Sequence, residues 1–190
     1  MIRWILITLI AFTSIAHADT TLSLMGSLNY NNPDPDESTY DGKSGGGAGV
    51  GLRALMGISD QLLFRSGGGL VYKKFTVESN GASKGDFDFS FTYLSIPLTL
   101  YWKASPQVGI FGGTSLNAKM NDSCDANGDF DTCEIDEEKA VVFPAIIGFD
   151  FNFTERLGME ISYEYGMTET AKDLKVHSAV VSLLYHFDNT

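Results

Sequence analysis

An acidic segment that contains two cysteines is the first feature that could carry chemistry. Residues 121–138 contain eight carboxylates and no basic residue. Calcium prefers clustered oxygen ligands, and Asp125, Asn127, Asp129 and Asp131 supply them at every second position. An EF-hand loop beginning at Asp125 would also need Gly at its sixth position and Glu at its twelfth, where this chain has Phe and Asp. We therefore favour a hydrated acidic loop over a specific calcium site, and we predict no cofactor.

Nucleophilic catalysis would need a serine and a histidine within reach of each other. Beyond residue 18 the chain has His177 and His186. His177 adjoins Ser178, but neighbours on a strand point to opposite faces, and Ala179 takes the position on the same face as His177. The sequence thus favours a protein that is not an enzyme, with a lipid-modifying enzyme kept as an alternative.

The first eighteen residues are typical of an export signal. Arg3 precedes an apolar run, and the segment ends in Ala16-His17-Ala18. This pattern predicts a signal peptide over residues 1–18, cleaved before Asp19, and a single domain over 19–190. Since exported proteins meet oxidising conditions, Cys124 and Cys133 are expected to form a disulfide.

Net charge limits the partners. The full chain carries a net charge of −11, and loss of the signal peptide removes one basic residue, Arg3. A chain this acidic does not suit nucleic acid, which proteins bind through basic patches. The sequence therefore predicts no nucleic-acid partner.

The elements that must position these residues are strands. Apolar and polar residues alternate with period two from residue 19 onward, which predicts an all-β fold. Eight segments follow this pattern: 20–30, 46–58, 62–76, 87–102, 108–120, 140–153, 157–168 and 175–187. Short links at 59–61, 104–107 and 154–156 alternate with long ones at 31–45, 77–86 and 121–139, as in outer-membrane barrels with short periplasmic turns. We predict a closed, eight-stranded, antiparallel up-and-down transmembrane β-barrel.

One face of each strand suits hydrocarbon. In residues 157–167, Leu157, Ile161 and Tyr163 alternate with residues such as Glu160 and Gly158. A soluble β-sandwich would also alternate, but it would place many Lys and Glu on its wet face. Here the second face is rich in Gly, Ser and Asn, which indicates a crowded barrel interior.

Charged residues on that second face are expected to meet. An eight-stranded barrel is just wide enough to be filled by side chains, and unpaired charges inside it would be costly. Counting from the periplasmic rim puts Arg53, Arg65, Asp150 and Glu160 at similar height, with Glu164 on the same face. We predict that these five residues form an ion-pair network that fills the lumen, with a proton or ion relay as the alternative.

Three segments carry a family resemblance. They are YLSIPLTLYW at 93–102, VGIFGGTSLNAKM at 108–120 and the closing VVSLLYHF, with Tyr185 and Phe187 in alternation. Together they resemble the small bacterial outer-membrane β-barrel proteins, the OmpX-like group. The resemblance implies a protein of the Gram-negative outer membrane, surrounded by outer-membrane lipid and inserted by the barrel-assembly machinery.

These observations lead to a functional hypothesis. A barrel with a filled lumen would act without catalysis, through the loops at 31–45 and 121–139, on an extracellular surface ligand or as a structural part of the envelope. The alternatives are a narrow channel for small solutes and the lipid-modifying enzyme.

Overall fold

The computed structural model describes residues 20–35, 39–80, 85–128, 133, 139–171 and 174–187. The predicted signal peptide, residues 1–18, lies outside this part of the chain. No helix that could span a membrane is found among the described residues. Within them the strands are β1 (Thr20–Pro35), β2 (Tyr40–Lys43), β3 (Gly45–Gly57), β4 (Leu62–Ser79), β5 (Gly85–Lys103), β6 (Val108–Gly128), β7 (Val141–Val142), β8 (Pro144–Asn152), β9 (Leu157–Gly166) and β10 (Leu174–His186).

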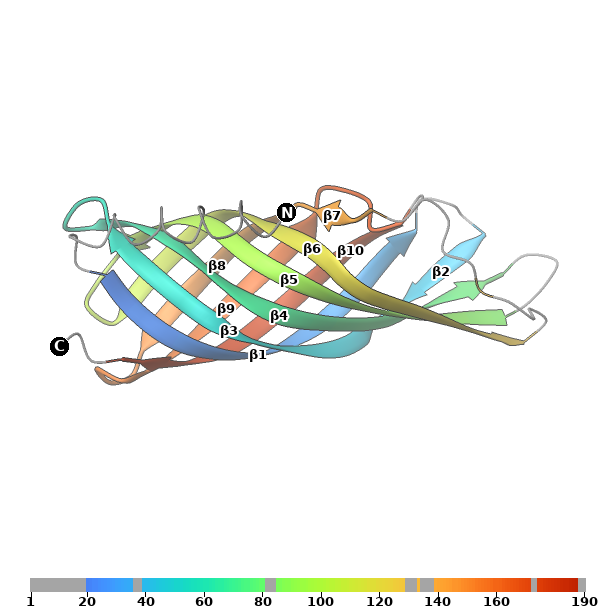
Figure 1. The fold of residues 1–190 in the computed structure, drawn as a ribbon, viewed down its shortest axis with the longest axis horizontal. Coiled ribbons are helices and arrows are strands. Elements are labelled where there is room, and N and C mark those ends of the chain that lie inside the picture. The colour runs from blue at the N-terminus through green and yellow to red at the C-terminus, as the bar shows by residue number, and fades with distance from the viewer. Residues whose placement is uncertain are drawn as a thin grey trace, which may run out of the picture.

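Eight of these strands close into a ring (Figure 1). Each is antiparallel to its neighbours in the order β1, β3, β4, β5, β6, β8, β9 and β10, and β10 pairs again with β1. The short strands β2 and β7 add to β4 and β6. Within the ring each wall strand pairs with a neighbour on both sides, as a sheet surrounded by lipid requires. The predicted eight-stranded antiparallel barrel is confirmed.

Side chains alternate across the wall as the sequence predicts. On β9 the exposed residues include Leu157, Ile161 and Tyr163, whereas Gly158 and Glu160 are buried. An outer surface of this kind suits the hydrocarbon layer, because each apolar side chain there avoids water.

Three tight turns share one end of the barrel, and each is closed by a hydroxyl group. Ser59 Oγ accepts from the Leu62 N–H at 3.1 Å, and Ser105 Oγ accepts from the Val108 N–H at 3.1 Å. Thr154 Oγ1 accepts from the N–H of the residue three positions later at 3.0 Å. Such hydroxyl-capped turns fix the register of the strands that they join.

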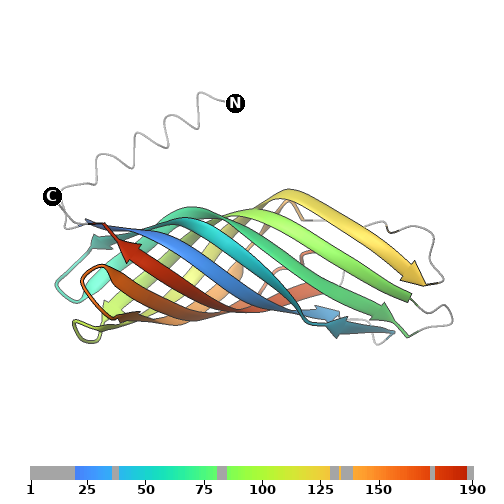
Figure 2. The ribbon, with the colours of Figure 1, turned by 90° about the horizontal axis from the view of Figure 1, so that it is seen from below.

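At the opposite end the strands run further than the sequence suggested. Residues 31–35, 77–79, 85–86 and 121–128 were expected in loops but belong to β1, β4, β5 and β6. Figure 2 shows β4, β5 and β6 (green to yellow) extending past the other wall strands. The polar composition of 121–128 pointed to a loop, yet these residues pair with β5 because, beyond the membrane, both faces of a strand can meet water. A bulge at Thr92/Tyr93 adjusts the register where this extension begins.

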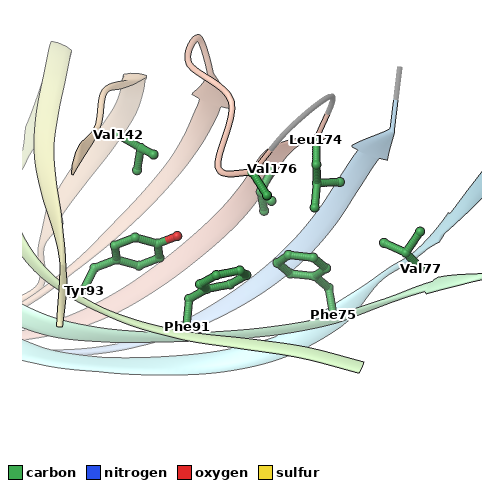
Figure 3. Packing of buried hydrophobic residues seen from close by; sticks show 8 residues of the cluster. Phe75, Val77, Phe91, Tyr93, Val142, Leu174 and Val176 are labelled. Carbon is green, nitrogen blue, oxygen red and sulfur yellow. The ribbon is translucent and has the colours of Figure 1, made fainter. Parts of the chain in front are cut away.

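Two apolar clusters lie inside the fold. The lower cluster, nearer the tight turns, contains Leu55, Leu63, Tyr101, Phe111 and Ile146. The upper cluster contains Phe75, Val77, Phe91, Tyr93, Val142, Ala171, Leu174 and Val176, with Tyr40 and Phe89 packed against it. In Figure 3 the rings from β4 and β5 face Val142 and Val176 across the interior. The upper cluster therefore fills part of the barrel interior at the end that carries the long loops.

Candidate functional site

Four charged side chains form a buried layer inside the barrel, toward the tight-turn end. Glu160 accepts from Arg65 at two points, from Nε at 3.0 Å and from Nη2 at 2.6 Å. Arg53 Nη1 donates to the same carboxylate at 2.7 Å and also bonds Asp150. All four residues are buried. We call Arg53, Arg65, Asp150 and Glu160 the lower charge layer.

Strand register explains how the layer forms. Asp150 on β8 and Glu160 on β9 are direct cross-strand partners, a pairing of like charges that is unfavourable by itself. Arg53 on β3 and Arg65 on β4 reach them from the far wall of the ring. Because each guanidinium has several donors in one plane, two arginines can bond two carboxylates that face each other, although Asp150 Oδ1 has no hydrogen-bond partner among the described residues.

Small residues make room for the large side chains of this region. Arg65 lies over the Phe111 ring, 4.3 Å from its centroid. A Cβ on Gly148 would lie only 2.5 Å from the Phe111 ring, and one on Gly109 would lie 2.0 Å from the Tyr101 hydroxyl. The glycines on the inward face thus permit close packing inside the ring.

Glu164 belongs to a second layer. It was predicted to join the same network, but its carboxylate accepts from Lys73 Nζ at 2.6 Å. Lys73 also donates to Ser178 at 2.9 Å, and Ser178 donates to Asn31 at 2.9 Å. Glu164 lies four positions along β9 from Glu160, a rise of about 13 Å, which is too far for one compact cluster. We call Asn31, Lys73, Glu164 and Ser178 the upper charge layer.

The sequence analysis missed Lys73. Lys73 lies on the same face of β4 as the inward-facing Val71, Phe75 and Val77, so the period-two pattern contains the signal. The sequence analysis named Arg53 and Arg65 as the cations of the interior and did not consider this lysine, which stands alone in an apolar series. The partner of Glu164 therefore went unrecognised.

A serine–histidine contact also escaped sequence reasoning. Ser23 Oγ lies 2.8 Å from His186 Nδ1, and His186 Nε2 lies 2.9 Å from Asn152 Oδ1. Ser23 is fully buried, and His186 is 7% exposed. His177, the histidine beside Ser178, instead stacks on Tyr165 with ring centroids 4.6 Å apart. The contact could be found only once β1 and β10 were known to be neighbours, because 163 residues separate Ser23 from His186.

The acidic segment starts as a strand. Cys124 and Cys133 form a disulfide with Cα atoms 5.7 Å apart. Asp125 and Asn127 lie on extended β6, two residues apart, so the chain does not coil around a centre there. Asp129 and Asp131 lie outside the described residues. In the part of the chain that is described, no three His, Cys, Asp or Glu residues are placed to hold a metal ion. Our preference for a hydrated loop stays a prediction.

Comparison with solved structures supports the fold. The structure of Ail, the attachment invasion locus protein of Yersinia pestis, in complex with the heparin analogue sucrose octasulfate, aligns with a TM-score of 0.51 at 14% identity. That alignment covers 88% of this chain and 99% of Ail. Neisserial surface protein A (NspA) aligns with a TM-score of 0.53 at 14% identity, over 87% of this chain and 97% of NspA. At such low identity these likenesses concern the fold alone.

Sequence comparison identifies the family. No curated protein matches this chain. The family model described as the outer membrane protein beta-barrel domain matches residues 5–187, nearly the whole sequence. The closed ring, the apolar outer surface and the alternation of tight turns with long connections agree with that match. This chain therefore belongs to the outer membrane protein β-barrel domain family.

Proposed function

We propose that this protein is a closed outer-membrane barrel that conducts no solute and acts without catalysis, through the part that projects outside the cell. Residues 1–18 would direct export and be removed, and the barrel-assembly machinery would insert the remainder. The observation that carries the proposal is the difference between the two parts of the molecule. The interior is crossed by paired charges and apolar side chains, whereas β4, β5 and β6 extend well beyond the ring.

The interior argues against a channel. A solute would have to pass the upper apolar cluster, the Lys73–Glu164 pair and then the lower charge layer. Separating a buried ion pair leaves uncompensated charge and costs roughly 3–5 kcal/mol. A route that crosses an apolar cluster and then two layers of paired charge does not suit rapid diffusion.

The Ser23–His186 contact argues for a structural role rather than lipid chemistry. Ser23 Oγ faces the inside of the wall, next to Arg53 Nη2 at 3.5 Å, and is fully buried. Lipid surrounds the outside of the wall, so an acyl chain has no direct route to this hydroxyl. A lipid-modifying role would predict altered lipid A acylation when the protein is expressed.

The projecting part has an acidic outer face. We call residues 40–43, 74–79, 85–92 and 121–128 the outer sheet. Its water-facing carboxylates lie in cross-strand rows and belong to Asp41, Glu78, Asp86, Asp88 and Asp125. Two cations, Lys43 and Lys74, lie on the same face. Complementary potentials favour encounter, so this face suits a cationic or neutral partner. The sulfated sugar in the Ail structure is a polyanion, and an acidic face would repel it.

Trimming the outer sheet tests the proposal. Thr76 and Asp88 are cross-strand partners, so residues 77–87 can be replaced by Asn-Gly to leave a shorter hairpin. Gram-negative cells displaying the full barrel should adhere to polylysine-coated surfaces more than cells displaying the trimmed barrel, with no gain on heparin. Glu155→Gln, in a tight turn at the opposite end, is the control and should leave adhesion unchanged. Equal adhesion by the full and trimmed barrels, both shown to be folded, would contradict the surface role.

A further inference from the structure

A cavity of about 60 Å³ lies between the two charge layers. Residues from both layers line it, including Arg53, Arg65 and Glu160 from below and Lys73 and Glu164 from above. Ser27, Ser95, Ser162 and Ser182 add hydroxyl groups to its wall. The cavity therefore combines charged and neutral hydrogen-bonding groups with apolar residues such as Val50, Leu52 and Val71.

Two buried polar atoms in the wall of this cavity lack a hydrogen-bond partner among the described residues. They are Arg53 Nε, a donor, and Asn29 Oδ1, an acceptor. Arg53 is 2% exposed and Asn29 is 6% exposed. Asn29 is held in place because its Nδ2 donates to the Tyr72 carbonyl at 3.1 Å. Burying a polar atom without a partner is costly, so each of these atoms calls for a hydrogen-bonding group inside the cavity.

The chemistry of these two atoms identifies the ligand. An anion such as chloride could accept from Arg53 Nε but could not donate to Asn29 Oδ1, and a metal ion could not accept from Arg53. An apolar molecule would satisfy neither atom. Water both donates and accepts, and a polar cavity that offers two or more partners per molecule is the kind that holds it.

We propose that this cavity is a permanent internal water site, a chamber of about four water molecules at the roughly 15 Å³ that each requires. The waters accept from Arg53 Nε, donate to Asn29 Oδ1 and connect the lower charge layer to the upper one. Both layers and the upper apolar cluster enclose the chamber, so its waters exchange slowly with bulk solvent. This inference goes beyond the surface role and stands whether or not the outer sheet binds a partner.

The Arg53 Nε–H proton reports on the chamber directly. In isotopically labelled barrel folded in detergent micelles, we expect water cross-peaks to this proton, with the NOE sign of long-lived bound water. Ser182→Val places methyl groups in the cavity wall and should reduce those cross-peaks severalfold. Ser115→Val is the matched control, because Ser115 is an inward-facing, fully buried serine that is not part of the cavity wall.

Three results would overturn the inference. One is a folded wild-type barrel with no water cross-peak at Arg53 Nε–H. Another is a loss of cross-peaks that is equal in the Ser182 and Ser115 variants. The third is a saturable shift of the Arg53 Nε resonance on titration with bromide, which would assign the cavity to an anion. Solute conductance by the wild-type barrel would contradict the closed lumen and leave the water site standing, so the two proposals fail separately.

Discussion

Arg65 donates a hydrogen bond to each carboxylate oxygen of Glu160, and Arg53 Nη1 donates to one of the same oxygens at 2.7 Å. The carboxylate of Glu160 is therefore the common partner of two guanidinium groups that come from the opposite wall. Asp150 bonds Arg53, whereas Glu160 bonds both Arg53 and Arg65, so Asp150 is the less connected of the two acids. This hierarchy gives the first expectation for stability.

Removing the shared carboxylate should be costly. Glu160→Gln removes the negative charge that two buried guanidinium groups share, and we expect a loss of about 3–5 kcal/mol in the free energy of unfolding. In a double-mutant cycle of Arg65→Met and Glu160→Met, the double variant should lose less stability than the two single variants added together, because neither charge is then left without its partner. Urea unfolding in lipid bilayers measures the cycle. Additive losses would show that Arg65 and Glu160 do not interact.

A charged residue on the outer surface should lower the free energy of unfolding more, the deeper it lies in the membrane. Ile161 lies near the middle of β9 and Leu157 begins it, and the two are similarly exposed at 44% and 52%. Ile161→Arg should cost about 2–4 kcal/mol, and Leu157→Arg about 0–1 kcal/mol, since the bilayer midplane excludes charge most strongly. The same unfolding measurement compares them. Equal costs would argue that no hydrocarbon layer surrounds this wall.

Two glycines give a matched test of packing inside and outside the ring. A Cβ on Gly148 would lie 2.5 Å from the Phe111 ring and 2.7 Å from the Ile161 carbonyl oxygen, whereas a Cβ on Gly26 would meet nothing within 4 Å. Gly148→Ala should destabilise the barrel by about 1–3 kcal/mol through overpacking. Gly26→Ala should leave stability nearly unchanged. If both variants unfold alike, the interior is less tightly packed than described.

An ion pair on the outer sheet should be sensitive to acid. The hydrogen bond from Lys43 lowers the pKa of Glu78 below its ordinary value of 4.5. Because the pKa of Glu78 is lower in the folded state, the ion pair stabilises the fold at pH values above the ordinary pKa. This stabilisation is lost as the pH falls through the lowered pKa of the folded state. Lys43→Met should raise the pKa of Glu78 in an NMR titration, and Lys74→Met, a lysine on the same face, should not. An unchanged pKa of Glu78 in Lys43→Met would contradict the pairing.

Much of the wall could be predicted from the sequence, since a period of two specifies both strand and face. Ile161 outside and Glu160 inside follow from alternation alone, and height counting placed Asp150 level with Glu160. Contacts across the ring were harder. Lys73 pairs with Glu164 from a strand 91 residues away, and the lysine was hidden in an apolar series. Strand length also escaped prediction, because polar residues 121–128 pair through backbone groups that composition does not reveal.

Single-channel recording across a planar bilayer tests the closed lumen most directly. Wild-type barrel, shown to be folded by its altered gel migration before boiling, should give no conductance steps above the bare bilayer in about 1 M potassium chloride, where ions are abundant and surface charge is screened. Glu160→Gln, which opens the lower charge layer alone, should still be silent because the Lys73–Glu164 pair and the upper apolar cluster remain. Reproducible steps from folded wild-type protein would contradict the account and establish a channel.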